Sequence, residues 1–347
     1  MRNFLIVLLT SLALALVLSA CGSGDTPPES GGGAAQENHI EQIAPSADND
    51  DLHQAEHSDD AAGEPEMREF EHGKGVSRIP VHPERIVAIQ YTGAMLALGV
   101  KPVGADNEWA QYPLLRDEWT DIPHVGDPWT GLNLEKIVAL EPDLIVTHVE
   151  DTYEELSKIA PTLWIPWLTY DPPQQIELFG EILGRQEEAA AWLERFEHKV
   201  MQTKAEVETI IDPEETVAIV NIRPQNLFVY GNKAMGGYVI YELLGLKAPP
   251  LIRREVLDKG LGQLEISLEL LPTYADANRL FVSVLEQEGG AERAEEIRAG
   301  GVWQALPAAR DKRISSLDWN TFFTTDPIST MKQLDAFVEL LRARQPD

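Results

Sequence analysis

The chain has 347 residues, of which 44% are hydrophobic and 24% charged, so it can form two domains of ordinary size with a large core. Its 57 acidic and 28 basic residues give a formal net charge of −29. Such a surface repels nucleic acid and anionic lipid, which argues against a phosphate-backbone partner. It still permits a small anionic ligand in a cleft that contains its own arginines.

The N-terminus has the pattern of a secretory signal peptide. A basic start at Arg2 is followed by an uncharged run from Phe4 to Leu18, which ends in the small residues before Cys21. This run is shorter than the about 20 residues that a transmembrane helix needs. The sequence Leu-Ser-Ala-Cys resembles the bacterial lipoprotein box, in which the cysteine is acylated. We therefore expect a signal peptide over 1–20 and a lipid on Cys21, the only cysteine, which excludes a disulfide within the chain.

Residues 21–75 are rich in Gly, Ser, Pro, Asp and Glu and show no hydrophobic period. Such a segment buries too little apolar surface to offset its ordering entropy, so we expect a flexible acidic tether. Its histidines leave weak metal binding open as an alternative.

An α/β lobe is predicted for residues 76–185. Short β-branched runs alternate here with stretches of helical spacing, which indicates a parallel sheet covered by helices. The expected elements are strands at 85–89, 102–105 and 144–146, and helices at 93–98, 134–140 (with Asn133 as N-cap) and 174–183.

A long helix is predicted over 186–211, and its apolar residues keep to one face. At 1.5 Å per residue it would span roughly 40 Å, longer than one small domain needs. Either it lies on the surface of one domain or it joins two lobes. The alternation restarts over 212–347, with strands at 216–222 and 280–285 and helices at 237–244 and 334–341, which favours two lobes.

Three blocks of sequence, in order, resemble the siderophore- and cobalamin-type periplasmic binding proteins. They are 79–104 (from Ile-Pro-Val-His-Pro-Glu-Arg-Ile-Val), 125–146 (ending Pro-Asp-Leu-Ile-Val) and 303–314 (beginning Trp-Gln-Ala-Leu-Pro). With the lipoprotein box, the chain is most similar to the iron-siderophore-binding lipoproteins of Gram-positive bacteria. The resemblance implies two lobes, one connecting helix, a cleft between the lobes and docking on an ABC permease. The family's docking glutamate is missing from the first helix, so the docking acids stay unassigned.

The ligand-binding candidates follow the predicted strands, because ligands of open α/β sheets lie at the carboxyl ends of the strands. Arg offers a planar fork of donors to oxygen clusters, while Trp and Tyr give broad apolar contact with a polar tip. For His148 a hydrogen-bonded structural role is preferred over a metal ligand, because a metal site needs more such ligands nearby. The candidates are Tyr91, Trp109, Trp129, His148, Arg223, Tyr230, Tyr238 and Trp319. Gln90, Asp106, Trp167 and Tyr170 lie in the same loops.

The predicted function is therefore that of an extracellular, lipid-anchored and monomeric binding protein. Its expected ligand is a ferric siderophore, with no catalytic residues, no resident metal and no cofactor apart from the lipid. Cobalamin, haem or a metal ion are alternative ligands, and the siderophore class stays open. A secreted enzyme is the less favoured alternative, since the chain lacks a Gly-x-Ser-x-Gly elbow, a His-Glu-x-x-His motif and a phosphate loop.

Overall fold

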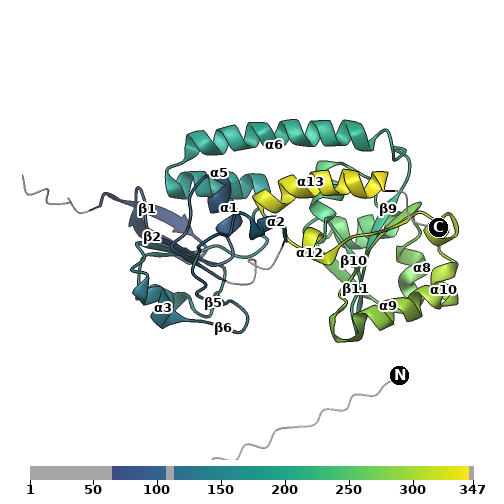
Figure 1. The fold of residues 1–347 in the computed structure, drawn as a ribbon, viewed down its shortest axis with the longest axis horizontal. Helices are drawn as coiled ribbons and strands as arrows, with labels where there is room; N and C mark the ends of the chain where they lie inside the picture. Colours follow the sequence, from purple (N-terminus) through teal and green to yellow (C-terminus); the bar gives the residue numbers. More distant parts are fainter. Residues whose placement is uncertain (1–64, 107–112, 344–347) are drawn as a thin grey trace, which may run out of the picture. The chain divides into compact units, whose positions relative to one another are not determined.

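Two separate β-sheets organise the part of the chain that the structure, a computed structural model, describes: residues 65–106 and 113–343 (Figure 1). The described residues belong to one unit, Ala62–Asp347. The predicted signal peptide, Cys21 and most of the predicted tether lie outside the described residues, as does Trp109.

The N-terminal half contains a four-stranded parallel sheet in the order β4-β3-β7-β8. Its central strands β3 and β7 are buried along their whole length, as expected for strands covered on both faces. Asn133 caps α3 as predicted, since its Oδ1 accepts the N–H of Lys136 at 2.9 Å. The elements are β3 (Ile86–Ala88), α1 (Thr92–Ala97), β4 (Gly104–Ala105), α2 (Pro113–Arg116), β5 (Gly126–Asp127), β6 (Gly131–Leu132), α3 (Leu134–Ala139), β7 (Leu144–Thr147), α4 (Tyr153–Leu156), β8 (Thr162–Trp164) and α5 (Pro172–Leu183).

An antiparallel hairpin precedes this sheet and corrects the expected start of the fold near Val76. Strands β1 (Met67–His72) and β2 (Gly75–Pro80) pair along their full length. The hairpin buries Phe70 and Ile79, whereas most of its other side chains are exposed or half-buried. Its charged, half-exposed pattern resembles a linker in the sequence, which explains why the prediction assigned β1 to the tether.

Helix α6 (Gln186–Val207) follows α5, and it ends before the predicted Ile211. Its 22 residues span about 33 Å, and it packs on α5 and on the C-terminal helix α13 (Pro327–Arg342), as Figure 1 shows. Helix α13 also contacts α1 and α2 of the N-terminal half. The chain therefore passes between the halves along α6, while α13 packs against helices of both, a contact that the sequence did not predict.

The C-terminal half has a mixed sheet of five strands in the order β11-β10-β9-β12-β13. Strands β9, β12 and β13 are parallel, whereas β10 runs antiparallel to both of its neighbours. The predicted helix at 237–244 is a short π-helix, η2. The elements are β9 (Val217–Ile222), β10 (Leu227–Tyr230), η2 (Tyr238–Leu243), α7 (Pro250–Ile252), η3 (Arg253–Leu257), β11 (Gln263–Ile266), η4 (Leu268–Leu270), α8 (Leu271–Tyr274), β12 (Arg279–Val284), η5 (Gln287–Gly289), α9 (Gly290–Ala299), α10 (Gly301–Gln304), α11 (Pro307–Arg310), β13 (Ile314–Ser316) and α12 (Trp319–Phe322).

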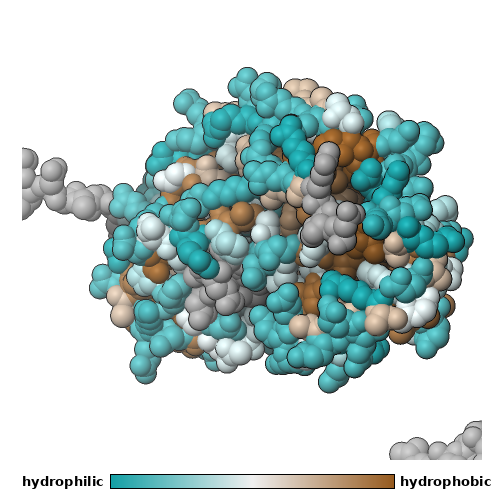
Figure 2. Space-filling model, turned by 45° about the vertical axis from the view of Figure 1, so that its right-hand side comes forward, coloured by the Kyte–Doolittle hydropathy of each residue, from teal (hydrophilic) through white to brown (hydrophobic). Residues whose placement is uncertain are grey.

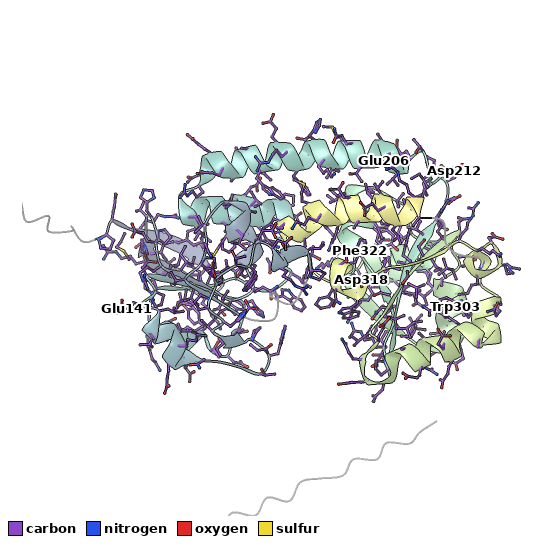
Figure 3. All side chains as sticks on the ribbon, viewed as in Figure 1. Glu141, Glu206, Asp212, Trp303, Asp318 and Phe322 are labelled. Carbon is purple, nitrogen blue, oxygen red and sulfur yellow. The ribbon has the colours of Figure 1, made fainter. Side chains whose placement is uncertain are left out.

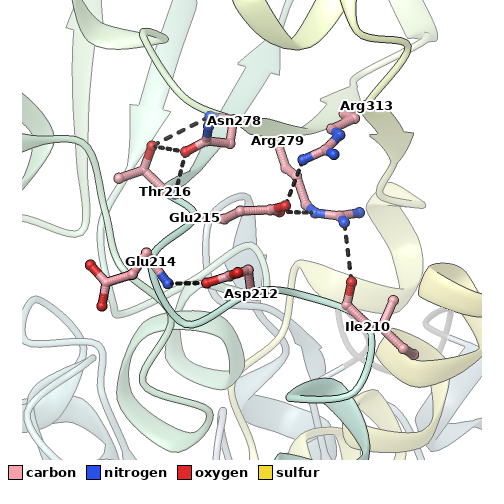
Figure 4. A network of polar contacts seen from close by, with 8 residues as sticks. All are labelled: Ile210, Asp212, Glu214, Glu215, Thr216, Asn278, Arg279 and Arg313. Atoms are coloured by element: carbon pink, nitrogen blue, oxygen red, sulfur yellow. Dashed lines mark hydrogen bonds and ion pairs between the residues drawn. The ribbon is translucent and has the colours of Figure 1, made fainter.

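A polar network fastens the chain that leaves α6 to the start of this sheet (Figure 4). The Glu215 carboxylate pairs with Arg279 and with Arg313, both at 2.5 Å, and Arg279 also donates to the carbonyl of Ile210 at 3.2 Å. Both carboxylate oxygens are thus engaged by arginines, and the network has a structural role.

One hydrophobic core runs through both halves of the described region. It includes Met95 of α1, Phe179 of α5 and Phe337 of α13 together with the strands of the second sheet. The face in Figure 2 is mostly hydrophilic, with apolar surface confined to patches. No helix within residues 65–106 and 113–343 has the length and apolar composition needed to cross a bilayer.

Candidate ligand-binding site

A cavity of about 510 Å³ lies between loops of the two halves, where several strands end. Loops after β3 and β8 supply one side, and β9, β10, β11 and the α12–α13 connection supply the other. Four predicted residues line it: Tyr91, Arg223, Tyr230 and Trp319. Further lining residues include Gln90, Trp167, Tyr170, Gln175, Gln263, Phe323 and Asp326.

Arg223 is held in the cavity wall by neutral groups. Its Nε donates to Asn221 Oδ1 at 2.9 Å, and one terminal nitrogen donates to Tyr230 Oη at 2.8 Å and to Gln263 Oε1 at 3.2 Å. The guanidinium lies over the rings of Phe228 and Trp319, 4.4 and 5.5 Å from their centroids. Among the described residues, no carboxylate forms an ion pair with Arg223. Its positive charge is therefore available to an anionic or oxygen-rich ligand.

Two of the tyrosines that line the cavity, Tyr91 and Tyr230, use their hydroxyls within the protein. Tyr91 Oη donates to the carbonyl of Ile165 at 2.9 Å, and burial raises the pKa of Tyr91 well above its usual value. Burial also raises the pKa of Tyr230, although the neighbouring Arg223 partly opposes this shift. Both phenols stay neutral at physiological pH. Tyr91 therefore offers the cavity mainly its ring, and Tyr230 orients Arg223.

Trp129, Trp167 and His148 form an aromatic cluster beside the cavity. The ring of Trp129 lies 5.7 Å from Trp167 and 5.5 Å from His148, edge-on to each. Trp129 and Trp167 are 58% and 41% exposed, and only Trp167 of the three lines the cavity. Asp127 fixes the β5–β6 turn, because its Oδ1 accepts the backbone N–H groups of Trp129 and Thr130 at 2.8 Å. The cluster thus extends the cavity wall with exposed apolar surface.

His148 does not have the hydrogen bonds of the structural histidine that the sequence favoured. Both ring nitrogens are buried, and neither has a hydrogen bond of standard geometry in the described part of the chain. Burial lowers the pKa of His148 to about 4, although the nearby backbone of Ile89 partly offsets this effect. The ring is neutral at physiological pH and packs against Trp129.

Tyr238 lies apart from the other predicted residues. It lines a smaller neighbouring pocket of about 270 Å³, together with Asp171 and Glu242. Burial raises the pKa of Tyr238, and the two nearby carboxylates raise it further. The structure therefore groups Tyr238 with polar residues outside the main cavity. Trp109, the remaining candidate, lies outside the described residues.

The connection from α12 to α13 supplies cavity residues that the sequence did not predict. Figure 3 labels Asp318, which precedes α12, and Phe322, which ends it; Asp318 caps this helix by accepting the N–H of Thr321 at 2.7 Å. Asp326 caps α13 by accepting the N–H of Ser329 at 3.0 Å, and burial raises its pKa. Of the described lining residues, Arg223 and Asp326 are the only two that carry a formal charge in their ionised state.

Sequence reasoning also missed Gln263 and Gln175. Gln263 begins β11, an edge strand that pairs antiparallel with β10, and the sequence of this strand shows no clear hydrophobic period. Gln175 lies in the first turn of α5 and reaches the carbonyls of Tyr170 and Thr325, at 3.1 and 3.4 Å. No local signal marks either position, because folding brings them to the cavity from distant parts of the sequence.

Two α/β halves that share a long helix and enclose a cavity between strand-end loops are the architecture of a two-lobed solute-binding protein. The Periplasmic binding protein family model matches residues 86–321, and the chain belongs to this family. The predicted fold class is thereby confirmed. The chain is thus a substrate-binding protein and not an enzyme, as predicted.

Three relatives illustrate the likeness. The iron(3+)-hydroxamate-binding protein YxeB of Bacillus subtilis is 32% identical over 290 residues, which are 83% of this chain and 89% of the relative. The crystal structure of Staphylococcus aureus SirA complexed with staphyloferrin B has 29% identity and a TM-score of 0.69, covering 79% and 98% of the two chains. A periplasmic binding protein component of a Fep/Fec-like ferrichrome ABC transporter from Bacillus subtilis has 28% identity and a TM-score of 0.70, covering 79% and 100%.

Proposed function

We propose that this protein captures an iron(III)-siderophore outside the cell and delivers it to an ABC permease, while a lipid on Cys21 retains it at the membrane. The observation that carries the proposal is Arg223, an arginine without a carboxylate partner among the described residues, set between aromatic rings in a cavity that both halves line. YxeB is named as an iron(3+)-hydroxamate-binding protein and SirA forms a complex with staphyloferrin B, which supports a siderophore as the ligand class.

The chemistry of the cavity suits a preformed chelate. A ferric siderophore presents oxygen atoms around the metal and a bulky organic shell, so it matches an arginine fork and broad aromatic walls. A bare transition metal or haem iron would instead require protein ligands. Within the described ranges no group of three or more His, Cys, Asp or Glu side chains is placed to hold a metal ion. These residues favour the chelate over a free ion.

Titration of intrinsic tryptophan fluorescence tests the proposal, because Trp167 and Trp319 line the cavity. We expect saturable quenching at submicromolar concentration by at least one ferric siderophore, with ferrichrome, ferrioxamine B and staphyloferrin B as probes. The iron-free forms serve as controls and should bind more weakly. Tight binding of zinc, manganese, haem or cobalamin, without binding of any ferric siderophore, would contradict the proposal.

A further inference from the structure

Gln90 has an unusual backbone conformation at the edge of the cavity. It follows β3 and has a φ of 88°, in the left-handed region that residues with a Cβ rarely adopt. Such a conformation persists only where surrounding groups hold it, and it is found preferentially at ligand-binding and active sites. The contacts of Gln90 therefore indicate which function its backbone conformation has.

Asp106 holds Gln90 in this conformation. Asp106 is fully buried and follows β4, the strand that pairs with β3. Its Oδ1 accepts the backbone N–H of Gln90 at 2.8 Å, and its own N–H donates to the carbonyl of Ala88 at 3.3 Å. The two strand ends are thus linked in both directions, and the carboxylate satisfies the backbone N–H of Gln90.

The side chain of Gln90 lines the cavity, and its carboxamide has no hydrogen-bond partner in the described part of the chain. The carboxamide oxygen Oε1 is also shielded from solvent. A buried polar group without a partner is costly, so such a group at a cavity wall is well suited to a ligand that provides the missing hydrogen bonds.

We infer that Gln90 is a hydrogen-bonding contact of the N-terminal half to the ligand, and that Asp106 is the positioning residue that presents it. The inference rests on the proposed function and narrows the ligand's chemistry. A carboxamide both donates and accepts, so its natural partner is a chelate whose shell contains amide groups besides the iron-binding oxygens. Arg223 in the C-terminal half would meet the chelating oxygens, and Gln90 would meet the amide-bearing shell.

A double-mutant cycle on the full-length protein tests the inference, with ferrioxamine B and ferrichrome as fluorescence-titration probes. Gln90→Gly adopts the same backbone conformation freely but lacks the carboxamide, so affinity should fall about five- to tenfold. Asp106→Ala should cause a similar loss in the native background. In the Gln90→Gly background the same Asp106→Ala change should have little further effect, because no side chain remains to be positioned.

Asp106→Asn retains a side-chain oxygen as acceptor and should bind better than Asp106→Ala. If Asp106→Ala does not fold, the affinity of Gln90→Gly alone decides whether Gln90 contacts the ligand. Glu141→Gly is the matched control, since Glu141 has a left-handed φ of 45° but is exposed and lies beside α3, away from α12 (Figure 3). Its affinity should equal that of the native protein. Additive losses in the cycle, or native affinity in Gln90→Gly, would overturn the inference. If the native protein binds no ferric siderophore, the proposed function itself fails.

Discussion

At the scale of single residues, Arg223 is the only cation among the described residues that line the cavity. Its partners Asn221, Tyr230 and Gln263 are neutral, so its charge is not cancelled locally. This arrangement orients the guanidinium without neutralising it, which is what recognition of a ligand oxygen cluster requires.

The loss of affinity caused by substituting Arg223 should therefore depend on the charge of the ligand. Arg223→Gln should weaken binding of an anionic chelate such as ferric staphyloferrin B by about 2–3 kcal/mol, because a charge-assisted hydrogen bond is lost, and should weaken binding of ferrichrome less. Fluorescence titration measures both. Arg254→Gln is the control, since Arg254 is exposed and pairs with Glu255 in the same half. Equal losses for both ligands would show that Arg223 only supports the structure.

The residue scale also shows how far the sequence could predict the site. The rule that ligands lie at the carboxyl ends of strands located Tyr91, Arg223 and Trp319 at the cavity, because it depends on the order of elements alone. It could not locate Gln263 or Asp326, which reach the cavity from an antiparallel edge strand and from a helix cap. The rule also indicated Tyr238, but this residue lines the smaller neighbouring pocket. Proximity along the chain does not determine which pocket a side chain enters.

At the scale of elements, one histidine contributes to the hydrogen bonds that join the β1–β2 hairpin to the edge strand β8. The ring nitrogen Nδ1 of His72 accepts the backbone N–H of Trp164 at 3.1 Å. The other nitrogen must then carry the proton and donate to Ser77 Oγ at 2.8 Å, and Ser77 donates to the carbonyl of Thr162 at 3.2 Å. The neutral tautomer is therefore the form that fits, and burial lowers the pKa of His72 below its usual 6.5.

This contact predicts a loss of stability in mild acid. The pKa of His72 is lower in the folded state than in the unfolded state. The stability that this residue contributes is therefore complete above pH 6.5, and it falls as the pH drops from there toward the pKa of the folded state. Urea unfolding of native protein and His72→Gln between pH 7.5 and 5 measures it. The stability difference between the two proteins should shrink as the pH falls. The lowered pKa of His148 also reduces stability in acid, and it does so in both proteins. Only the difference in unfolding free energy between native protein and His72→Gln is therefore informative. A difference independent of pH would refute this role.

Strands β1 and β11, which the sequence did not predict, share a physical cause. Strands β1, β10 and β11 pair in antiparallel fashion, and β1 and β11 expose part of their side chains. The patterns of β1 and β11 are weaker than the continuous apolar runs of β3 and β7, which were predicted well, whereas β10 is a buried apolar run that the prediction overlooked. Short exposed strands depend on their partners for stability, and a partner's position is not visible in a local window.

At the scale of the whole molecule, the proposed lipid on Cys21 would tether the folded part through the long acidic segment that follows it. Cys21→Ser should release the protein from the membrane fraction into the medium, because the acyl chains provide the membrane affinity. Fractionation of cells followed by immunoblotting measures this, and cellular uptake of the ferric siderophore should fall in parallel. An alanine substitution at Ser23, just beyond the lipoprotein box, is a suitable control. Retention of the Cys21→Ser protein at the membrane would contradict the anchor.

The C-terminal helix has a consequence for the order in which the molecule is completed. Helix α13 packs on α1, α2 and α5, yet it occupies residues 327–342, at the end of the described chain. During synthesis from the N-terminus, the first half therefore lacks one of its core partners until α13 has been made. The final packing of the first half therefore waits for α13, so its core is completed only after all strands of the second sheet have been made.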